Sequence, residues 1–341
     1  MKKEPVGKKQ KKHSLKESTI HDIAKVAGVS IGTVSRALNN KAGVHPKTRE
    51  RVLAISRDMN VKSRAGARRK QIAIPVTDRR ALVSETYAGA LCSHLMLELS
   101  RRDMFGMYIG SDEIDRLSRE IFDGIITTSW DESDMSVLRT IKKTPIIMAR
   151  YCKHDDEFII AGWDHRKEGM LVADHFFNRG HKRIAMLHMQ SRDSFNMAVE
   201  HRWQGLVKRA KVLGMELSAG QCRIFDSRNR MAPMLKQLVA DGIDGLWMPG
   251  HEYIAAEGLK ILQEVIGVKV PDDISVIGSE NSGVSALLQP ALTTVAGPFE
   301  ELVVSIIDRL EAMMIGNPDA LKLTPILSTP FLIERDSVAQ R

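Results

Sequence analysis

The first feature of the pattern is a pair of short amphipathic segments within residues 19–40, TIHDIAKVAGVSIGTVSRALNN. Apolar residues recur at helical spacing in both segments, and Gly28 lets the chain turn sharply between them. Thr19 and Ser30 are suited to cap the two helices, and Asp22 occupies the capping-box position three residues after Thr19. The two helices are predicted to pack together through a shared set of apolar side chains: Ile23, Ala24, Ala27, Val29, Val34, Ala37 and Leu38.

A third helix is predicted to begin at Pro46, because proline suits the first helical position and apolar residues recur after it. Those apolar residues are Val52, Ile55 and Met59. The second helix keeps one face free of apolar packing, and this face contains Ile31, Gly32, Ser35, Arg36 and Asn39. Three helices with the second one exposed are typical of a helix-turn-helix, in which that helix enters the major groove of DNA. The alternative is a helical hairpin that only packs.

From Ile72 onwards, short apolar runs alternate with longer amphipathic segments. The runs predicted to be buried strands are 72–76, 124–127, 145–148, 184–188, 245–248 and 274–277. The segments predicted to be helices are 84–102, 166–180, 200–214, 230–241, 253–265 and 299–315. This alternation indicates parallel sheets with helices on both faces. A weak sequence similarity between 122–126 and 243–247 indicates two similar lobes. Two such lobes place a ligand cleft at the carboxyl ends of their strands.

The charge is distributed unevenly along the chain. Residues 1–70 hold 19 lysines and arginines against 5 aspartates and glutamates, so this segment carries +14. The whole chain carries +8, which leaves −6 for residues 71–341. A basic head on a mildly acidic body indicates a polyanionic partner for the head, with a membrane surface as the competing partner. The first 17 residues hold seven lysines and few apolar side chains, which predicts a disordered basic tail.

Composition limits the remaining classes of protein. The chain has 341 residues, 43% of them apolar, which is enough for a small head and a body of two lobes. No segment approaches the roughly 18 consecutive apolar residues of a membrane span, and no apolar stretch follows the lysine-rich start as in a secretory signal. We therefore expect a cytoplasmic protein. Cys92, Cys152 and Cys222 are odd in number and widely spaced, which predicts buried free thiols.

Motifs of enzymes and cofactor sites are absent or stand in the wrong context. Residues 28–32 spell G-x-S-x-G, but a nucleophile elbow requires a strand before the serine, and a helix is predicted there. His251 and Glu252 lack the second histidine of a zinc-protease helix, because Ala255 occupies that position. The sequence contains no phosphate-binding glycine loop of the Walker or G-x-G-x-x-G type. We predict no catalytic residues, no metal site and no cofactor.

The sequence resembles the LacI/GalR family of lac repressor-type transcriptional regulators. In the head, the resemblance is carried by residues 19–40, followed by Val44, Thr48, Arg49 and Val52. In the body, it is carried by residues 162–185, 201–205, 271–278, 290–295 and 333–337. The resemblance covers nearly all of residues 18–338. It implies a small all-α helix-turn-helix head plus an α/β two-lobed periplasmic-binding-protein-like core with parallel sheets.

Pattern and resemblance together predict the domains. They are a disordered basic tail (1–17), a helix-turn-helix DNA-binding domain (18–60), a hinge or linker (61–71), and a two-lobed effector-binding and dimerisation core (72–341). Lys70 stands where the family has a leucine that wedges into the minor groove, and a lysine cannot wedge between stacked bases. Arg68 and Lys70 are candidates for insertion into a narrow minor groove, with a plain basic linker as the alternative.

The resemblance also implies DNA-binding residues in the head. Arg36 is the candidate for base reading, because a guanidinium can hold guanine O6 and N7 with two hydrogen bonds. Ile31 and Gly32 occupy the positions that the family varies between operators, and Ile31 can touch a thymine methyl group. Phosphate contacts, which fix the register without reading sequence, are expected from Ser30, Thr33, Ser35, Asn39 and Thr48. Thr19 is a further candidate for DNA binding. For the serines, capping or packing is the alternative.

In the core, the resemblance places effector contacts on Asp164 and Arg202. Arg202 is the stronger candidate, because an arginine can hold hydroxyl groups, a carboxylate or a phosphate. A surface ion pair is the alternative for Arg202. The other candidates lie where the chain departs from the family or where the first lobe would meet the ligand: Arg79, Tyr87, His251, Glu280 and Asn281. The departures indicate an effector unlike a plain hexose, and the arginines favour an anionic one.

These observations lead to one functional hypothesis. The chain is expected to be an effector-responsive DNA-binding transcriptional regulator, a repressor that reads a pseudo-palindromic operator as a homodimer. A small molecule, a sugar or an anionic sugar derivative, is expected to bind between the lobes. The alternative is a small-molecule binding protein without a DNA-dependent role, which the basic head opposes. An enzyme on the same scaffold would need a catalytic constellation, and the sequence contains none.

Overall fold

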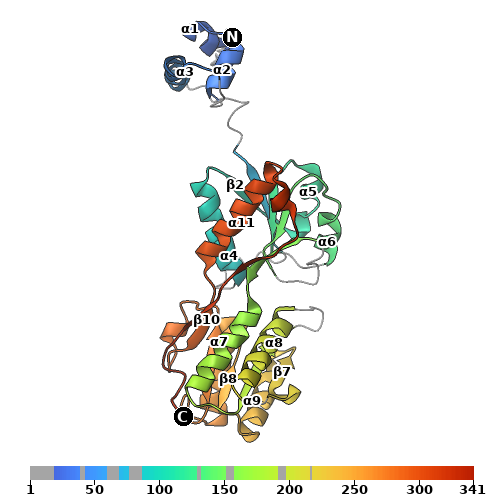
Figure 1. Cartoon of the computed structure of the whole chain (residues 1–341), viewed down its shortest axis with the longest axis vertical. Coiled ribbons are helices and arrows are strands. Elements are labelled where there is room, and N and C mark those ends of the chain that lie inside the picture. Colours follow the sequence, from blue (N-terminus) through green and yellow to red (C-terminus); the bar gives the residue numbers. More distant parts are fainter. Residues whose placement is uncertain are drawn as a thin grey trace, which may run out of the picture. The chain divides into compact units, whose positions relative to one another are not determined.

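The computed structural model shows a helical head and an α/β core, two compact units that divide between Arg69 and Lys70 (Figure 1). It describes residues 19–38, 43–59, 69–76, 87–128, 132–150, 157–190, 197–215 and 217–341. The three elements of the head come first along the chain, and all strands belong to the core.

The head consists of α1 (Ile20–Ala27), α2 (Ile31–Leu38) and α3 (Pro46–Asp58). The predicted apolar side chains pack into one small core between these helices. Its members are Ile23, Ala24, Ala27, Val34, Ala37 and Val52, with Ile20, Val29, Leu38, Val44, Ile55 and Met59 packed against them. The predicted helix-turn-helix arrangement is therefore confirmed, and the outer face of α2 stays free of this core.

Local hydrogen bonds fix the starts of the first two helices. The backbone N–H of Thr19 donates to the Asp22 carboxylate at 2.7 Å, and the Thr19 hydroxyl donates to the same oxygen at 2.8 Å. Ser30 Oγ accepts the backbone N–H of Thr33 at 3.1 Å, which is the usual N-cap contact. Between the helices, Gly28 has a φ of 60°, in the left-handed region that glycine adopts without strain. The caps and the turn are those that the sequence predicts.

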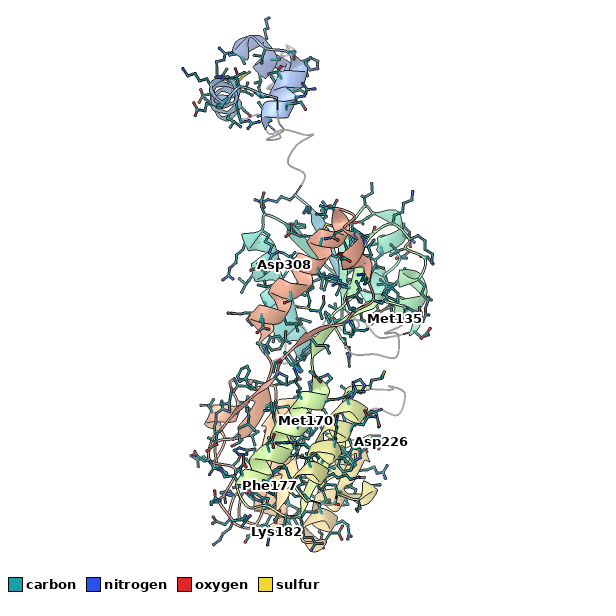
Figure 2. All side chains as sticks on the ribbon, in the orientation of Figure 1. Met135, Met170, Phe177, Lys182, Asp226 and Asp308 are labelled. Atoms are coloured by element: carbon teal, nitrogen blue, oxygen red, sulfur yellow. The ribbon has the colours of Figure 1, made fainter. Side chains whose placement is uncertain are left out.

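The first lobe of the core contains a six-stranded sheet with the order β11-β5-β4-β3-β1-β2, in which all neighbours are parallel. The strands are β1 (Gln71–Val76), β2 (Phe105–Gly110), β3 (Gly124–Thr127), β4 (Ile146–Met148), β5 (Ile159–Trp163) and β11 (Ile326–Ser328). One face is covered by α4 (Tyr87–Arg101) and α11 (Phe299–Met314), which pack against each other. The other face is covered by α5 (Arg116–Arg119) and α6 (Glu132–Leu138), where Met135 is fully buried (Figure 2).

The second lobe repeats this plan with the sheet order β12-β10-β9-β8-β6-β7. The strands are β6 (Ile184–Met189), β7 (Cys222–Phe225), β8 (Gly245–Trp247), β9 (Ser275–Ser279), β10 (Thr293–Ala296) and β12 (Phe331–Ile333). All neighbours are parallel except β12, which runs antiparallel to β10. One face packs against α7 (His165–Asn178) and α8 (Met197–Val212). The other packs against α9 (Met231–Ala240) and α10 (Glu252–Lys260).

The predicted strands and helices of the core are all present, and the strands that the sequence pattern missed fall into two groups. Four of the missed strands, β2, β7, β11 and β12, are the edges of the two sheets. An edge strand is partly exposed, as the pattern of β7 shows, so it lacks a continuous apolar run. The other two missed strands, β5 and β10, are buried but contain glycine or threonine among their apolar residues.

The lobes are connected near Trp163, the last residue of β5. The chain passes between the lobes after β5, after β10 and after β11. Trp163 is 3% exposed, and a Cβ atom on Gly297 would lie 1.8 Å from its Cε3 atom. The rings of Tyr87 and Phe299 each lie 4.8 Å from the Trp163 ring, nearly edge-on. The connection is therefore filled by aromatic rings, and only glycine fits at position 297.

The cysteines match the prediction in part. Cys92 is buried, and burial raises the pKa of its thiol to about 12. Cys222 is only half-buried, because it begins the edge strand β7. Cys152 lies outside the described residues. Across the described ranges, no group of three or more histidines, cysteines and carboxylates is arranged to hold a metal ion, and no helix is long and apolar enough to cross a membrane.

Helices α7 and α8 approach each other at two glycines. A Cβ atom on Gly169 would lie 2.2 Å from the carbonyl oxygen of Arg202, and one on Gly205 would lie 2.0 Å from the carbonyl oxygen of Arg166. Real Cβ atoms do not come this close to backbone atoms, so any side chain at either glycine would push the helices apart. The distance between these two helices is therefore set by the absence of side chains at the contact.

Gly169→Ala is expected to destabilise the core by about 1–3 kcal/mol, because the added methyl group meets backbone rather than a movable side chain. Urea unfolding followed by tryptophan fluorescence reports this, since Trp163, Trp203 and Trp247 belong to the described part of the core and the sequence of the head contains no tryptophan. Gly220→Ala is the control, because its Cβ would meet only Ser218 Oγ at 3.7 Å. Equal unfolding midpoints for the two variants would contradict the close contact.

Candidate functional site

The outer face of α2 carries the predicted base-reading residues. Arg36 and Gly32 are exposed, and Ile31 is 40% exposed at the start of the helix. Thr33 and Ser35 are half-buried beside them. Because Val34 and Ala37 hold the opposite face of α2 in the core of the head, this outer face is presented to solvent as a unit.

The hydroxyl residues expected at phosphates have different surroundings. The Ser30 hydroxyl caps α2 and lies 2.9 Å from the Thr33 hydroxyl, so the capping alternative applies to Ser30. Thr19 is exposed and bonded to Asp22, and Thr48 is half-buried in the first turn of α3. Asn39, the last phosphate candidate, lies outside the described residues, and so does Arg68, the minor-groove candidate. Phosphate contact by the hydroxyl residues and Asn39 stays a prediction, as does minor-groove insertion of Arg68.

Lys70 belongs to the core and not to a free connector. Its carbonyl oxygen accepts the backbone N–H of Phe105 at 2.8 Å, which continues the pairing of β1 with β2. Its Nζ donates to Glu311 of α11 at 3.1 Å, and Glu311 also accepts from Arg102 at 2.9 Å. The predicted linker 61–71 therefore extends two residues too far. Insertion of this lysine into a minor groove would require it to leave this ion pair.

Five polar side chains near the lobe connection form what we call the interlobe site. Its members are Tyr87, Glu168, Arg202, His251 and Glu280. Burial raises the pKa of Tyr87, the charge of Arg150 lowers it, and the charges of Glu280 and Glu168 raise it further. Tyr87 begins α4 of the first lobe, whereas Glu168 and Glu280 belong to the second lobe, so carboxylates of one lobe influence the pKa of a tyrosine of the other.

Glu168 and Arg202 form a buried ion pair between α7 and α8. They are 1% and 7% exposed, and Arg202 Nε donates to Glu168 Oε2 at 2.6 Å. His165 Nδ1 lies 2.7 Å from the same oxygen. Burial alone would raise the pKa of Glu168, but the charge of Arg202 and the contact with His165 lower it to about 2. The alternative prediction for Arg202 was a surface ion pair. An ion pair is present, but it is buried and not at the surface.

The loop after β9 presents Glu280 in a strained backbone. Glu280 and Asn281 have φ values of 84° and 51°. A positive φ is uncommon for glutamate and costs about 1–3 kcal/mol, whereas asparagine adopts it more readily. His251 Nδ1 lies 3.6 Å from one oxygen of Glu280. The other oxygen, Oε2, is buried and has no hydrogen-bond partner among the described residues. Asn281 Oδ1 accepts from Arg335 at 2.6 Å, so the oxygen of its side-chain amide is already engaged.

His188 lies beneath the interlobe site on β6. It is 4% exposed, and its Nδ1 lies 3.0 Å from the carbonyl oxygen of Pro249, to which it donates. Burial lowers its pKa, and the charges of Arg202, His251 and His165 lower it further, to about 3. His188 is therefore neutral at pH 7 and adds no charge to the site.

The remaining predicted effector contacts are placed as follows. The Asp164 carboxylate caps α7 and accepts the backbone N–H groups of Arg166 and Lys167 at 3.0 and 3.2 Å. The Tyr87 hydroxyl donates to the carbonyl oxygen of Ala149 at 3.5 Å. Arg79 lies outside the described residues.

The sequence interpretation missed Glu168 and His188, although a signal for Glu168 was present. Glu168, Val172 and Phe176 are spaced by four residues and share the buried face of α7. A carboxylate within an apolar stripe needs a partner, and that requirement identifies it as a candidate. His188 gave no such signal, because it ends an apolar run that any buried strand can contain.

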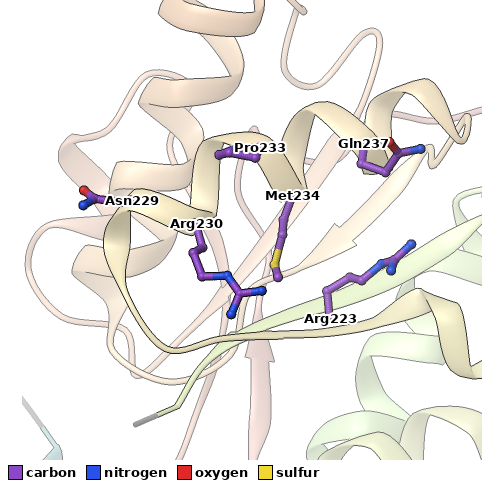
Figure 3. A pocket seen from close by; sticks show the side chains of 6 residues that line it. All are labelled: Arg223, Asn229, Arg230, Pro233, Met234 and Gln237. Atoms are coloured by element: carbon purple, nitrogen blue, oxygen red, sulfur yellow. The ribbon is translucent and has the colours of Figure 1, made fainter. Parts of the chain in front are cut away.

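A surface hollow of about 290 Å³ lies elsewhere, between β7 and α9 (Figure 3). Its lining residues are Arg223, Asn229, Arg230, Pro233, Met234 and Gln237. Both arginines lie near carboxylates, at 3.6 Å for Arg223 and Asp241 and 3.5 Å for Arg230 and Asp226. The hollow includes none of the predicted site residues.

The buried neutral His188 predicts acid sensitivity. Between the ordinary histidine pKa of 6.5 and its own of about 3, only the unfolded chain binds a proton at this site, so stability falls as the pH falls. The loss from this residue is about 1.4 kcal/mol per pH unit within that window. In urea unfolding at pH 7, 5.5 and 4.5, His188→Gln is expected to lose less stability than the unchanged protein. Equal pH dependence of the two proteins would contradict the lowered pKa of His188 in the folded state.

Comparison with known proteins agrees with this geometry. Residues 19–62 match the lacI family of bacterial regulatory proteins, and residues 173–338 match the periplasmic binding protein-like domain. The HTH-type transcriptional regulator DegA of Bacillus subtilis strain 168 is 29% identical over 312 residues, which cover 84% of this chain and 88% of DegA. DegA is a regulator, in agreement with the prediction that this chain is not an enzyme.

Solved structures share the fold. The lac repressor dimer bound to operator and the anti-inducer ONPF has a TM-score of 0.70 and 22% identity, covering 95% of this chain and all of that chain. The complex of the transcriptional regulator CelR with cellobiose has a TM-score of 0.65 and 20% identity, covering 94% of this chain and 99% of that chain. With a helix-turn-helix head followed by two α/β lobes, this chain belongs to the lacI family of bacterial regulatory proteins and is a transcriptional regulator with a periplasmic-binding-protein-like core.

Proposed function

We propose that this protein is an effector-controlled repressor that binds a pseudo-palindromic operator as a homodimer. The observation that carries the proposal is the exposed face of α2, where Arg36 and Ile31 point away from a closed helical core. The operator-bound dimer of lac repressor, which has the same fold, supports it. Two heads related by two-fold symmetry read half-sites about one helical turn apart, or a multiple of it.

The proposal extends to the core, where a sugar or sugar derivative binds at the interlobe site. Glu280 Oε2, buried and without a hydrogen-bond partner among the described residues, supports a ligand there. The CelR complex with cellobiose supports a sugar as the chemical class. Binding that differs in strength between two arrangements of the lobes shifts their populations and thereby changes the affinity for operator.

Arg36→Ala tests base reading. Operator sites are first selected from a random DNA pool with the full-length protein, and a two-fold symmetric site is expected. The variant should then bind the selected operator about 1–3 kcal/mol more weakly, with little change on random DNA, because only the specific complex contains the bidentate contact.

Arg51→Ala is the matched control, since Arg51 is an exposed arginine of the head on α3 rather than on α2. It should weaken binding to both DNAs alike, as the loss of a nonspecific charge does. Equal weakening on both DNAs by Arg36→Ala would reject Arg36 as a reader of bases.

Effector control is tested by a thermal-shift screen of sugars, sugar acids, sugar phosphates and nucleosides on the full-length protein. A ligand at about 100 times its Kd adds about 2.7 kcal/mol of stability, which a melting curve detects. The same ligand should change operator affinity about 5-fold or more in a fluorescence anisotropy titration. If the ligand stabilises the protein but does not change its operator affinity, effector control is rejected and the protein only binds the ligand.

A further inference from the structure

The buried pair of Arg202 and Glu168 bears on which effectors the interlobe site accepts. We propose that Glu168 restricts the effector to uncharged polyhydroxy compounds, because it already supplies the negative charge that Arg202 would otherwise take from a ligand. This inference rests on the proposed function, in which the effector binds at the interlobe site. It replaces the expectation, drawn from arginines in the sequence, of an anionic effector.

Glu168 is held in place and cannot give way to a ligand carboxylate. Its side chain is 1% exposed and shares one oxygen between Arg202 and His165. The next residue, Gly169, packs directly on the carbonyl of Arg202, where no Cβ atom fits. The backbones that carry the two charges therefore keep a fixed distance. An anion that displaced Glu168 would leave a buried carboxylate without its counter-ion, which is strongly unfavourable.

Arg202 can still donate hydrogen bonds to neutral oxygen atoms. Its Nε is engaged by Glu168, whereas its two terminal nitrogens have no hydrogen-bond partner within the described part of the chain. The side chain is 9% exposed, so part of it remains accessible. A hydroxyl or ring oxygen can accept from these nitrogens without bringing a second negative charge to the pair.

The other charges around the site also favour a neutral ligand. The charged groups that act on Tyr87 are Arg150, Glu280 and Glu168, and Arg202 pairs with Glu168. Among these four groups, the two guanidinium groups are balanced by the two carboxylates. The unpartnered oxygen of Glu280 accepts hydrogen bonds and repels carboxylates. The hydroxyl groups of a polyhydroxy compound can donate hydrogen bonds to Glu280 and accept hydrogen bonds from Arg202.

The test measures the binding of two anionic probes, inorganic phosphate and glucuronate, with glucose as the neutral analogue of glucuronate. Thermal shifts of the full-length protein are recorded at constant ionic strength set with sodium chloride. Three variants are compared with the unchanged protein: Glu168→Gln, the double variant Glu168→Gln/Arg202→Gln, and Asp174→Asn. The double variant removes both charges, so it reports any anion binding that does not involve this pair, including binding to the basic head.

Asp174→Asn is the matched control. Asp174 on α7 accepts from Arg209 Nε on α8 at 2.7 Å, so it also breaks an ion pair between these two helices. That pair is about one-third exposed and lies in later turns of the same helices. This variant therefore shows the effect of breaking an ion pair between α7 and α8 without changing the charge of the interlobe site.

Glu168→Gln is expected to bind phosphate or glucuronate at least about tenfold more tightly than the unchanged protein, because Arg202 then lacks a counter-ion. The double variant and Asp174→Asn should show no such gain. No gain in Glu168→Gln overturns the proposal, as does a gain of equal size in Asp174→Asn. If Glu168→Gln has no cooperative melting transition, calorimetric titration of the unchanged protein and the double variant decides. Equal anion affinity supports the proposal, and tighter binding by the unchanged protein overturns it.

Operator binding is measured on the same samples. Intact operator binding with no response to any ligand would refute effector control, whereas the anion affinities would still report the charge state of Arg202. The two failures are therefore distinguishable.

Discussion

The close contact between α7 and α8 is the constraint on which the interlobe site depends. At Gly169 and Gly205 the two backbones meet without intervening side chains. Only at this separation does the Nε of Arg202 reach Glu168 at 2.6 Å. Removing two charges from water is costly, and their attraction offsets that cost only when the geometry is good. The two glycines at the α7–α8 contact therefore also set the geometry in which the attraction between Arg202 and Glu168 offsets the cost of burying them.

The interlobe site combines polar groups that are fully engaged with others that are not. Glu168 has two partners, and the Asp164 carboxylate is used by the start of α7. Glu280, in contrast, is held in a strained backbone with one carboxylate oxygen unpartnered within the described ranges. Buried polar atoms usually have hydrogen-bond partners, so this unpartnered oxygen is a candidate contact for a ligand. Recognition is thus expected to concentrate on the loop after β9, with α7 and α8 as its rigid support.

Much of the fold was predictable because it follows from local periodicity. The helices of the head and the buried strands of the core carry apolar residues at the spacing of their own secondary structure. The four edge strands were missed because half-exposed strands do not have this signature. The site was harder to predict, since its chemistry depends on pairs that are distant in sequence. Arg202 was identified, but Glu168 lies 34 residues away on another helix, and no spacing rule connects them. The sequence therefore suggested a free cation where the fold contains a neutralised one.

The aromatic filling of the lobe connection has a consequence for how related sequences diverge. The indole of Trp163 occupies the space that a side chain at position 297 would need. Any residue other than glycine at 297 is therefore tolerated only after the tryptophan has been replaced by something smaller. Positions 163 and 297 lie on different segments that connect the two lobes, yet their side chains occupy the same space and cannot vary independently. Among close relatives, a change at one position should be accompanied by a change at the other.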